Sequence, residues 1–81
     1  MDLNQLKIFA SLAQTLNFSK TAKQFYLTQP AVSHHIKALE NSLVVTLLRR
    51  TNHKVVLTAE GEELYTYARQ ILDMAQTAEN R

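Results

Sequence analysis

Residues 28–40 read TQPAVSHHIKALE, and this stretch is typical of a capped amphipathic helix. Thr28 is a favourable N-cap, and Pro30 in the first turn costs little because early helix N–H groups lack intrahelical partners. At about 100° per residue, one stripe holds the apolar side chains Val32, Ile36, Leu39 and Leu43. The opposite face carries hydrogen-bond donors, acceptors and a cation, but no acid. We therefore expect a helix over about residues 29–42 that packs on one side and reads DNA base edges with the other.

Two shorter predicted helices precede this stretch. Apolar residues at helical spacing predict a first helix over residues 3–15, with Ile8 and Leu12 on a second apolar side. Ser19 is the expected N-cap of a short helix from Lys20 to about Phe25, followed by a turn at residues 26–27. A helix, a tight turn and a capped amphipathic helix make a helix-turn-helix. The alternative is an ordinary surface helix of an all-α domain.

Downstream of residue 43 the pattern becomes β-rich. The runs VVTLL (residues 44–48) and VVL (residues 55–57) predict two strands, and RRTNHK (residues 49–54) forms the basic tip between them. A basic hairpin after a helix-turn-helix is a wing, whose cations can follow the phosphate backbone or enter a narrow minor groove. The alternative is a solvated turn that contacts nothing.

A last helix is predicted from the cap Thr58 to about Glu79. Little of the chain remains to cover its apolar stripe, so we expect a homodimer seam, which Ile8 and Leu12 could complete. The alternative is that the stripe folds back onto its own domain. The residues assigned to the seam are Leu64, Ala68, Ile71, Leu72 and Ala75.

Charge is segregated along this 81-residue chain, which is long enough for one small domain. Residues 17–54 hold six lysines and arginines and all three histidines against a single acid, Glu40, although the whole chain has a net charge of only +2. A basic middle segment suggests a polyanion footprint, and chance clustering on a solvated surface is the alternative.

Several function classes lack support in the sequence. There is no cysteine, no apolar run long enough to span a membrane, and no signal-peptide pattern, which fits a cytoplasmic location. The neighbours His34 and His35 point about 100° apart on a helix, so they cannot chelate one metal; His35 lies nearer the apolar stripe. No catalytic triad, glycine-rich phosphate loop or carboxylate pair is evident. We expect no enzyme, no metal and no cofactor.

The sequence resembles the N-terminal DNA-binding region of LysR-type bacterial transcriptional regulators. The resemblance covers nearly the whole chain and rests on LNQLKIF (residues 3–9), Phe18-Ser19 with Ala22, LTQPAVSHHIKALE (residues 27–40), Leu43, Leu47, Arg50 and LTAEG (residues 57–61). It implies a winged helix-turn-helix with a long dimerising linker helix. It also implies base contacts from Gln29, Pro30, Ser33 and His34, and wing contacts around Arg50 and His53. Family members normally continue into an effector-binding domain, so a small-molecule effector is expected to bind only that further domain, and the chain is expected to be a fragment.

Two positions depart from the family pattern. The family usually has glycine where Val44 stands, and glycine suits a left-handed helix end that a β-branched residue adopts only with strain. The helix is therefore expected to end differently here. The family also usually has phenylalanine where Leu48 stands, which puts the packing under the wing in doubt.

The sequence thus predicts a mainly α fold: three helices and a two-stranded wing in residues 1–58, then a linker and dimerisation helix in residues 59–81. Its expected function is sequence-specific binding of double-stranded DNA by a dimer on a pseudo-palindromic site. A protein–protein interaction or dimerisation module without DNA binding is the alternative. The predicted DNA-binding residues are Thr28, Gln29, Pro30, Ser33, His34, Lys37, Arg50, Asn52, His53 and Lys54.

Overall fold

The computed structural model describes residues 1–80 and contains four helices and a two-stranded antiparallel sheet in that range. The elements are α1 (Leu3–Thr15), α2 (Phe18–Gln24), α3 (Gln29–Leu43), β1 (Leu48–Thr51), β2 (Lys54–Leu57) and α4 (Ala59–Glu79). This arrangement confirms the predicted mainly α, winged helix-turn-helix fold. Arg81, the last residue of the expected linker segment, lies outside the described residues. No helix of residues 1–80 combines the length and apolarity needed to cross a membrane.

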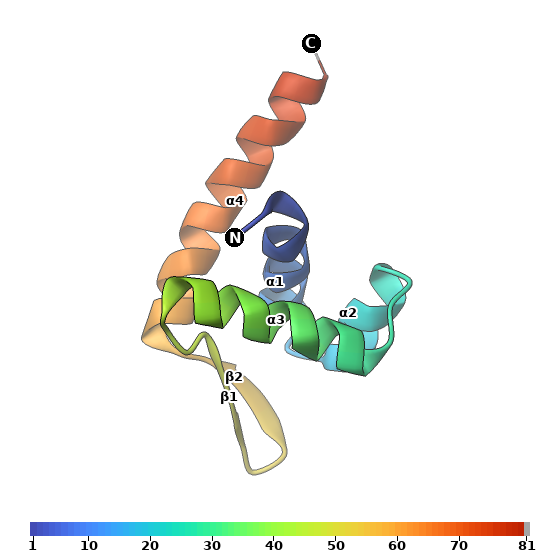
Figure 1. Ribbon diagram of the computed structural model, residues 1–81, viewed down its shortest axis with the longest axis vertical. Helices are drawn as coiled ribbons and strands as arrows, with labels where there is room; N and C mark the ends of the chain where they lie inside the picture. The colour runs from blue at the N-terminus through green and yellow to red at the C-terminus, as the bar shows by residue number, and fades with distance from the viewer. Residues whose placement is uncertain (81) are drawn as a thin grey trace.

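Helix α1 is the centre of the core, contacted by α2, α3 and α4 (Figure 1). Both of its apolar sides are used within the chain: Leu6, Ile8, Phe9 and Leu12 are each at most 1% exposed. The prediction that Ile8 and Leu12 could complete a dimer seam is therefore wrong. The reason is that α4 returns to the body after the wing. Together with α3, it covers the apolar sides of α1.

Helix α2 begins one residue after Asn17, which is its N-cap. The Asn17 side-chain oxygen accepts from the Lys20 backbone N–H at 3.0 Å, and its backbone is extended as a cap requires. The prediction of Ser19 as the cap is wrong because Ser19 already lies inside the first helical turn. The helix also ends at Gln24, one residue earlier than expected, and the predicted turn follows with Tyr26 at a positive φ of 57°.

A buried hydroxyl cluster ties α2 to α1. The Ser11 hydroxyl lies 3.1 Å from the Thr21 hydroxyl and donates to Gln24 Oε1 at 2.8 Å, and Thr15 lies 3.1 Å from Thr21 on the other side. Ser11 and Thr21 are both buried. Paired polar groups in a core have a defined geometry, so the cluster helps set the position of α2 under the helix that follows it.

Helix α3 ends at Val44 in the left-handed conformation, with φ 57° and ψ 44°. The Val44 backbone N–H is hydrogen-bonded to the Glu40 carbonyl, and the Val45 N–H reaches the same oxygen at 3.2 Å. The expectation that valine would make this helix end differently is wrong. The chain keeps the left-handed end that usually takes glycine, and valine bears the strain.

Val44→Gly is accordingly expected to raise the free energy of unfolding by about 0.5–1 kcal/mol. A left-handed L-residue costs roughly 1–2 kcal/mol, from which the greater entropy of glycine in the unfolded chain subtracts about 0.5–1 kcal/mol. Val44 is 87% exposed, so little packing is lost. Urea denaturation at one fixed protein concentration measures the change. Val56→Gly, the same substitution in β2 away from any positive φ, is the control and should destabilise; a loss of stability at both sites would contradict the strain argument.

The first strand differs from the prediction. Residues 44–47 are not a strand, and β1 begins at Leu48 and includes Arg49, Arg50 and Thr51, which had been predicted as the tip. Residues 44–47 are needed to end α3 and to bury Leu47 in the core, and the N–H of Leu47 bonds to a side chain instead of a strand. Their β propensity is overridden by these contacts.

The hairpin has a short tip. Arg50 pairs with Val55 and Thr51 with Lys54, which leaves Asn52 and His53 as a two-residue turn. Both turn residues have positive φ values, 48° and 64°, as this kind of tight hairpin turn requires. At the base of the hairpin Leu48 is half-buried and packs against the core, so leucine fills the position under the wing.

Helix α4 begins at the predicted cap. The Thr58 hydroxyl accepts from the Gly61 N–H at 3.0 Å, and Glu60 and Glu62 lie in the first turn, where the helix dipole favours negative charge. The first part of α4 packs on α1, and the rest projects beyond the body, on the side opposite the hairpin (Figure 1).

Candidate nucleic-acid interface

Six predicted contact residues lie at the start of α3 and along its exposed face. The Thr28 hydroxyl accepts from the Ala31 N–H at 3.2 Å and so caps the helix, as predicted. The buried side of α3 holds Val32, Ile36 and Leu39. Leu43, the fourth member of the predicted stripe, is 36% exposed because the helix ends there. We call the six exposed residues the reading face: Thr28, Gln29, Pro30, Ser33, His34 and Lys37.

The two histidines of α3 lie in different environments. His34 is exposed and His35 is half-buried, as the helical spacing predicts. Their rings are 6.2 Å apart, centroid to centroid, and inclined at 70°. Within residues 1–80 no three or more histidine, cysteine or acidic side chains are grouped closely enough to hold a metal ion.

The wing places three further predicted contact residues, Asn52, His53 and Lys54, at its exposed tip. Arg50, the fourth, also contacts a helix. Its guanidinium carbon lies 4.3 Å from the centre of the Phe18 ring, within the range of a cation–π contact. The pairing of Arg50 with Val55 places both on the sheet face that turns toward the helices. Arg50 therefore braces the wing against α2 while its charge stays exposed.

A shallow groove joins the reading face to the wing. We call it the α3–wing groove; it is lined by Phe18, Ser33, Ile36, Lys37, Glu40, Leu48 and Arg50. Lys37 contributes a cation from α3, and Arg50 contributes one from β1. The structure thus brings together two basic segments that the sequence separates by more than ten residues, and both lie along one surface.

Glu40 makes a link beside this groove that the sequence did not reveal. Its carboxylate accepts from the backbone N–H groups of Leu47, at 2.7 Å, and Leu48, at 3.4 Å. Glu40 thereby links the reading helix directly to the start of the wing. Its signal in the sequence was its isolation, since it is the single acid of the basic block and lies near the predicted end of a helix.

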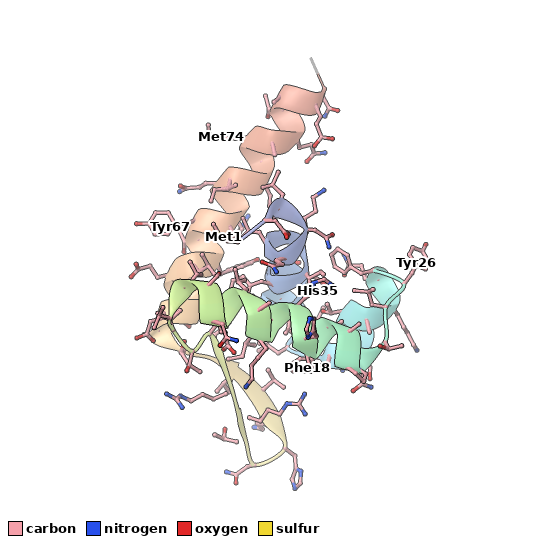
Figure 2. All side chains as sticks on the ribbon, in the orientation of Figure 1. Met1, Phe18, Tyr26, His35, Tyr67 and Met74 are labelled. Carbon is pink, nitrogen blue, oxygen red and sulfur yellow. The ribbon has the colours of Figure 1, made fainter. Side chains whose placement is uncertain are left out.

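The residues predicted for a dimer seam do not form one surface. Ala68 is fully buried against the core, and Leu72 is half-buried and packed against it, so both face inward on α4. The assignment of Ala68 to a seam is wrong because α1 covers it within the chain. Ile71 is exposed, and Leu64 and Ala75 are half-buried. Tyr67 and Met74, at 54% and 74% exposed, project from the side of α4 away from α1 (Figure 2).

Comparison with known proteins adds to this geometry. Residues 3–62 match a family described as bacterial regulatory helix-turn-helix proteins, lysR family. The Hca operon transcriptional activator HcaR of Escherichia coli (strain K12) is 42% identical over 81 residues, which are 100% of this chain and 27% of HcaR. The HTH-type transcriptional regulator HdfR of Shigella boydii serotype 18 (strain CDC 3083-94 / BS512) is 42% identical over 78 residues, 96% of this chain and 28% of HdfR. The chain therefore spans little more than a quarter of the length of these curated relatives.

A solved structure resembles the fold closely. The crystal structure of a CbnR_DBD–DNA complex has a TM-score of 0.93 and 36% sequence identity, and the match covers 100% of this chain and 93% of that one. The reading face and the wing thus belong to an architecture that has been crystallised with DNA in another protein.

Proposed function

This chain belongs to the LysR family of bacterial regulatory helix-turn-helix proteins, and we propose that it binds double-stranded DNA sequence-specifically as the DNA-binding part of a cytoplasmic transcriptional regulator. One observation carries the proposal: the exposed reading face, which holds no acid, meets the basic wing at one groove, which Lys37 and Arg50 both line. The helix is wide enough to fill a major groove, and the wing extends from beside it to reach the backbone or the adjacent minor groove. The family match and the DNA-bound relative support the same function.

The proposed contacts divide between base reading and positioning. At the start of α3, Gln29 can pair with adenine through its amide, and Pro30 can contact a thymine methyl group. Ser33 and His34 follow on the same exposed face, and Lys37 reaches bases or phosphates. Thr28 is assigned to the DNA phosphate backbone beside the start of α3. In the wing, phosphate or minor-groove contacts are assigned to Arg50, Asn52, His53 and Lys54.

Gln29→Ala tests whether α3 reads bases. We expect a loss of about 1–3 kcal/mol in binding to the preferred site, with binding to unrelated duplexes nearly unchanged. Mobility-shift titrations of both duplexes at several salt concentrations measure the two affinities. Lys54→Ala, in the wing tip, is the matched comparison. It should weaken both duplexes alike and reduce the salt slope by about one.

Two results would count against this assignment. If Gln29→Ala weakened both duplexes equally, Gln29 would be a positioning residue. If the unmodified chain showed no salt-dependent binding to any duplex, a protein–protein interaction module would replace DNA binding as the function.

We further propose that two copies pair through the exposed side of α4 in residues 59–80. The argument is the apolar surface formed by Ile71, Tyr67 and Met74 on a helix that projects from the body. Paired subunits would present two reading helices to successive major grooves of a pseudo-palindromic site, since the symmetry of such a site matches a two-fold dimer. A division between a DNA-binding unit (residues 1–58) and a linker helix fits this arrangement. A small-molecule effector, where the relatives use one, is proposed to act elsewhere in a longer protein.

Ile71→Asp tests the pairing. Burying an unpaired carboxylate in an apolar contact is costly, so the dimer dissociation constant should rise by at least about 10-fold. Sedimentation over a range of concentrations measures the constant. Gln70→Asp, at the adjacent exposed position, is the control and should leave the constant nearly unchanged. An unchanged mass for Ile71→Asp relative to a dimeric parent would remove Ile71 from the interface, and a parent that stays monomeric would refute pairing by this chain.

A further inference from the structure

One hydrogen bond on the reading face joins two helices. The Gln29 Nε2 group donates to the Ser19 hydroxyl oxygen at 2.6 Å, across ten residues of sequence. Gln29 is the first residue of α3, and Ser19 is the second residue of α2. Both side chains are exposed, so the bond lies on the surface that is proposed to face DNA.

Neither side chain is needed to cap its own helix. Asn17 caps α2, which leaves the Ser19 hydroxyl available. Thr28 caps α3, which leaves the Gln29 amide available. The bond between them is therefore not a by-product of capping, and the two residues are held together by the way α2 and α3 pack.

The chemistry of the amide gives this bond a consequence. A glutamine amide has one oxygen acceptor and two N–H donors. If the N–H that points away from Oε1 serves Ser19, the other N–H and Oε1 remain side by side. This donor–acceptor pair matches the N7 acceptor and N6 donor of adenine in the major groove. A free amide samples several side-chain rotamers, whereas an amide bonded to Ser19 is held at one place beside the start of α3.

We propose that Ser19 is a positioning residue for base recognition, which holds the Gln29 amide at one place on the reading face and thereby strengthens the base preference at the position that Gln29 reads. The inference rests on the proposed function, because it assumes that Gln29 faces a base. Without Ser19 the amide is free to leave that place. The paired contact with adenine then forms less often, and the preference for adenine over guanine, whose N7 and O6 are both acceptors, falls.

The test uses the 81-residue chain and duplexes drawn from random sequence. Selection with the unmodified chain defines the preferred site, and Gln29→Ala identifies the base pair at which preference is lost. Affinities of Ser19→Ala and Ser19→Thr are then measured for duplexes that carry each of the four base pairs at that position, and for an unrelated duplex. Ser42→Ala, the same substitution near the other end of α3, is the matched control.

We expect Ser19→Ala to reduce discrimination at the Gln29 position by about 3- to 10-fold, the effect of one net hydrogen bond. Preferences at the other positions and binding to the unrelated duplex should be unchanged. Ser19→Thr retains a hydroxyl and should restore discrimination, and Ser42→Ala should behave like the unmodified chain. In the free protein, the NMR resonances of the Gln29 side-chain amide should shift in Ser19→Ala. The other resonances should keep the pattern of the folded chain.

Several results would overturn the proposal. Equal weakening of every duplex by Ser19→Ala would show that Ser19 contacts the DNA phosphate backbone. Unchanged discrimination between base pairs would show that Gln29 needs no support from Ser19. If the unmodified chain itself failed to discriminate between sequences, the proposed function would fail together with this inference. If that chain discriminated and Ser19→Ala discriminated equally well, only the role of Ser19 would be refuted.

Discussion

Leu12→Ala is expected to lower the free energy of unfolding by about 2–5 kcal/mol, the usual cost of removing a buried leucine and leaving a cavity. Leu12 is completely buried in α1, where it belongs to the core cluster that α1 shares with α3 and α4. A domain of this size has a total stability on the order of 5–10 kcal/mol, so the loss would be a large part of it. Urea denaturation followed by circular dichroism measures the change.

The same substitution elsewhere in α1 provides the control. Leu3 is 48% exposed at the first position of the helix, and Leu3→Ala should cost less than about 1 kcal/mol. The measurement also separates a core residue from a subunit contact. The loss at Leu12 should be independent of protein concentration, whereas a loss that appears only where the chain is dimeric would place Leu12 in an interface.

Gly61→Ala is expected to destabilise the fold by roughly 2–3 kcal/mol, although alanine is the better helix former by about 1 kcal/mol. Gly61 is buried in the first turn of α4, and a Cβ there would overlap the Leu47 carbonyl oxygen and come within 3.0 Å of Leu57 Cδ2. The Leu47 carbonyl cannot easily withdraw, because it accepts from the Thr58 backbone N–H at 3.0 Å and from the Thr58 hydroxyl at 3.3 Å.

Thermal or urea unfolding of Gly61→Ala measures this steric cost. Glu63→Ala, at an exposed position half a turn away, should stay within about 0.5 kcal/mol of the unmodified chain. A Gly61→Ala variant that gained about 1 kcal/mol would show that helix propensity prevails over the close approach of α4 to Leu47.

Most of the helical architecture followed from local sequence. The limits of α1, α3 and α4 and the caps Thr28 and Thr58 agree with the pattern of apolar residues and capping side chains. The exposed positions of Gln29, Ser33 and Lys37 followed in the same way, because the face opposite a buried stripe must meet solvent. Their contacts with DNA remain proposals.

The errors cluster where distant residues compete with local preference. The run of residues 44–47 has strong β propensity, but Glu40 bonds the Leu47 N–H and Leu47 enters the core, so the strand starts later. Ser19 is a good cap by composition, but Asn17 has the extended backbone and Ser19 meets Gln29 from the next helix. No pattern within a few residues carries that information.

Local sequence was therefore sufficient for the helix-turn-helix, the caps and the amphipathic reading helix, because each depends on residues within one or two turns. Tertiary contacts decided the late start of β1 and the inward face of Ala68, because Glu40 bonds the Leu47 N–H and both Leu47 and Ala68 are buried in the core. The physical reason is that burial in the core outweighs propensities of about 1 kcal/mol or less per residue. In residues 28–40, the sequence specified which side chains face outward. Packing brought Glu40 into hydrogen bonding with the Leu47 N–H and brought Gln29 into hydrogen bonding with Ser19 of α2.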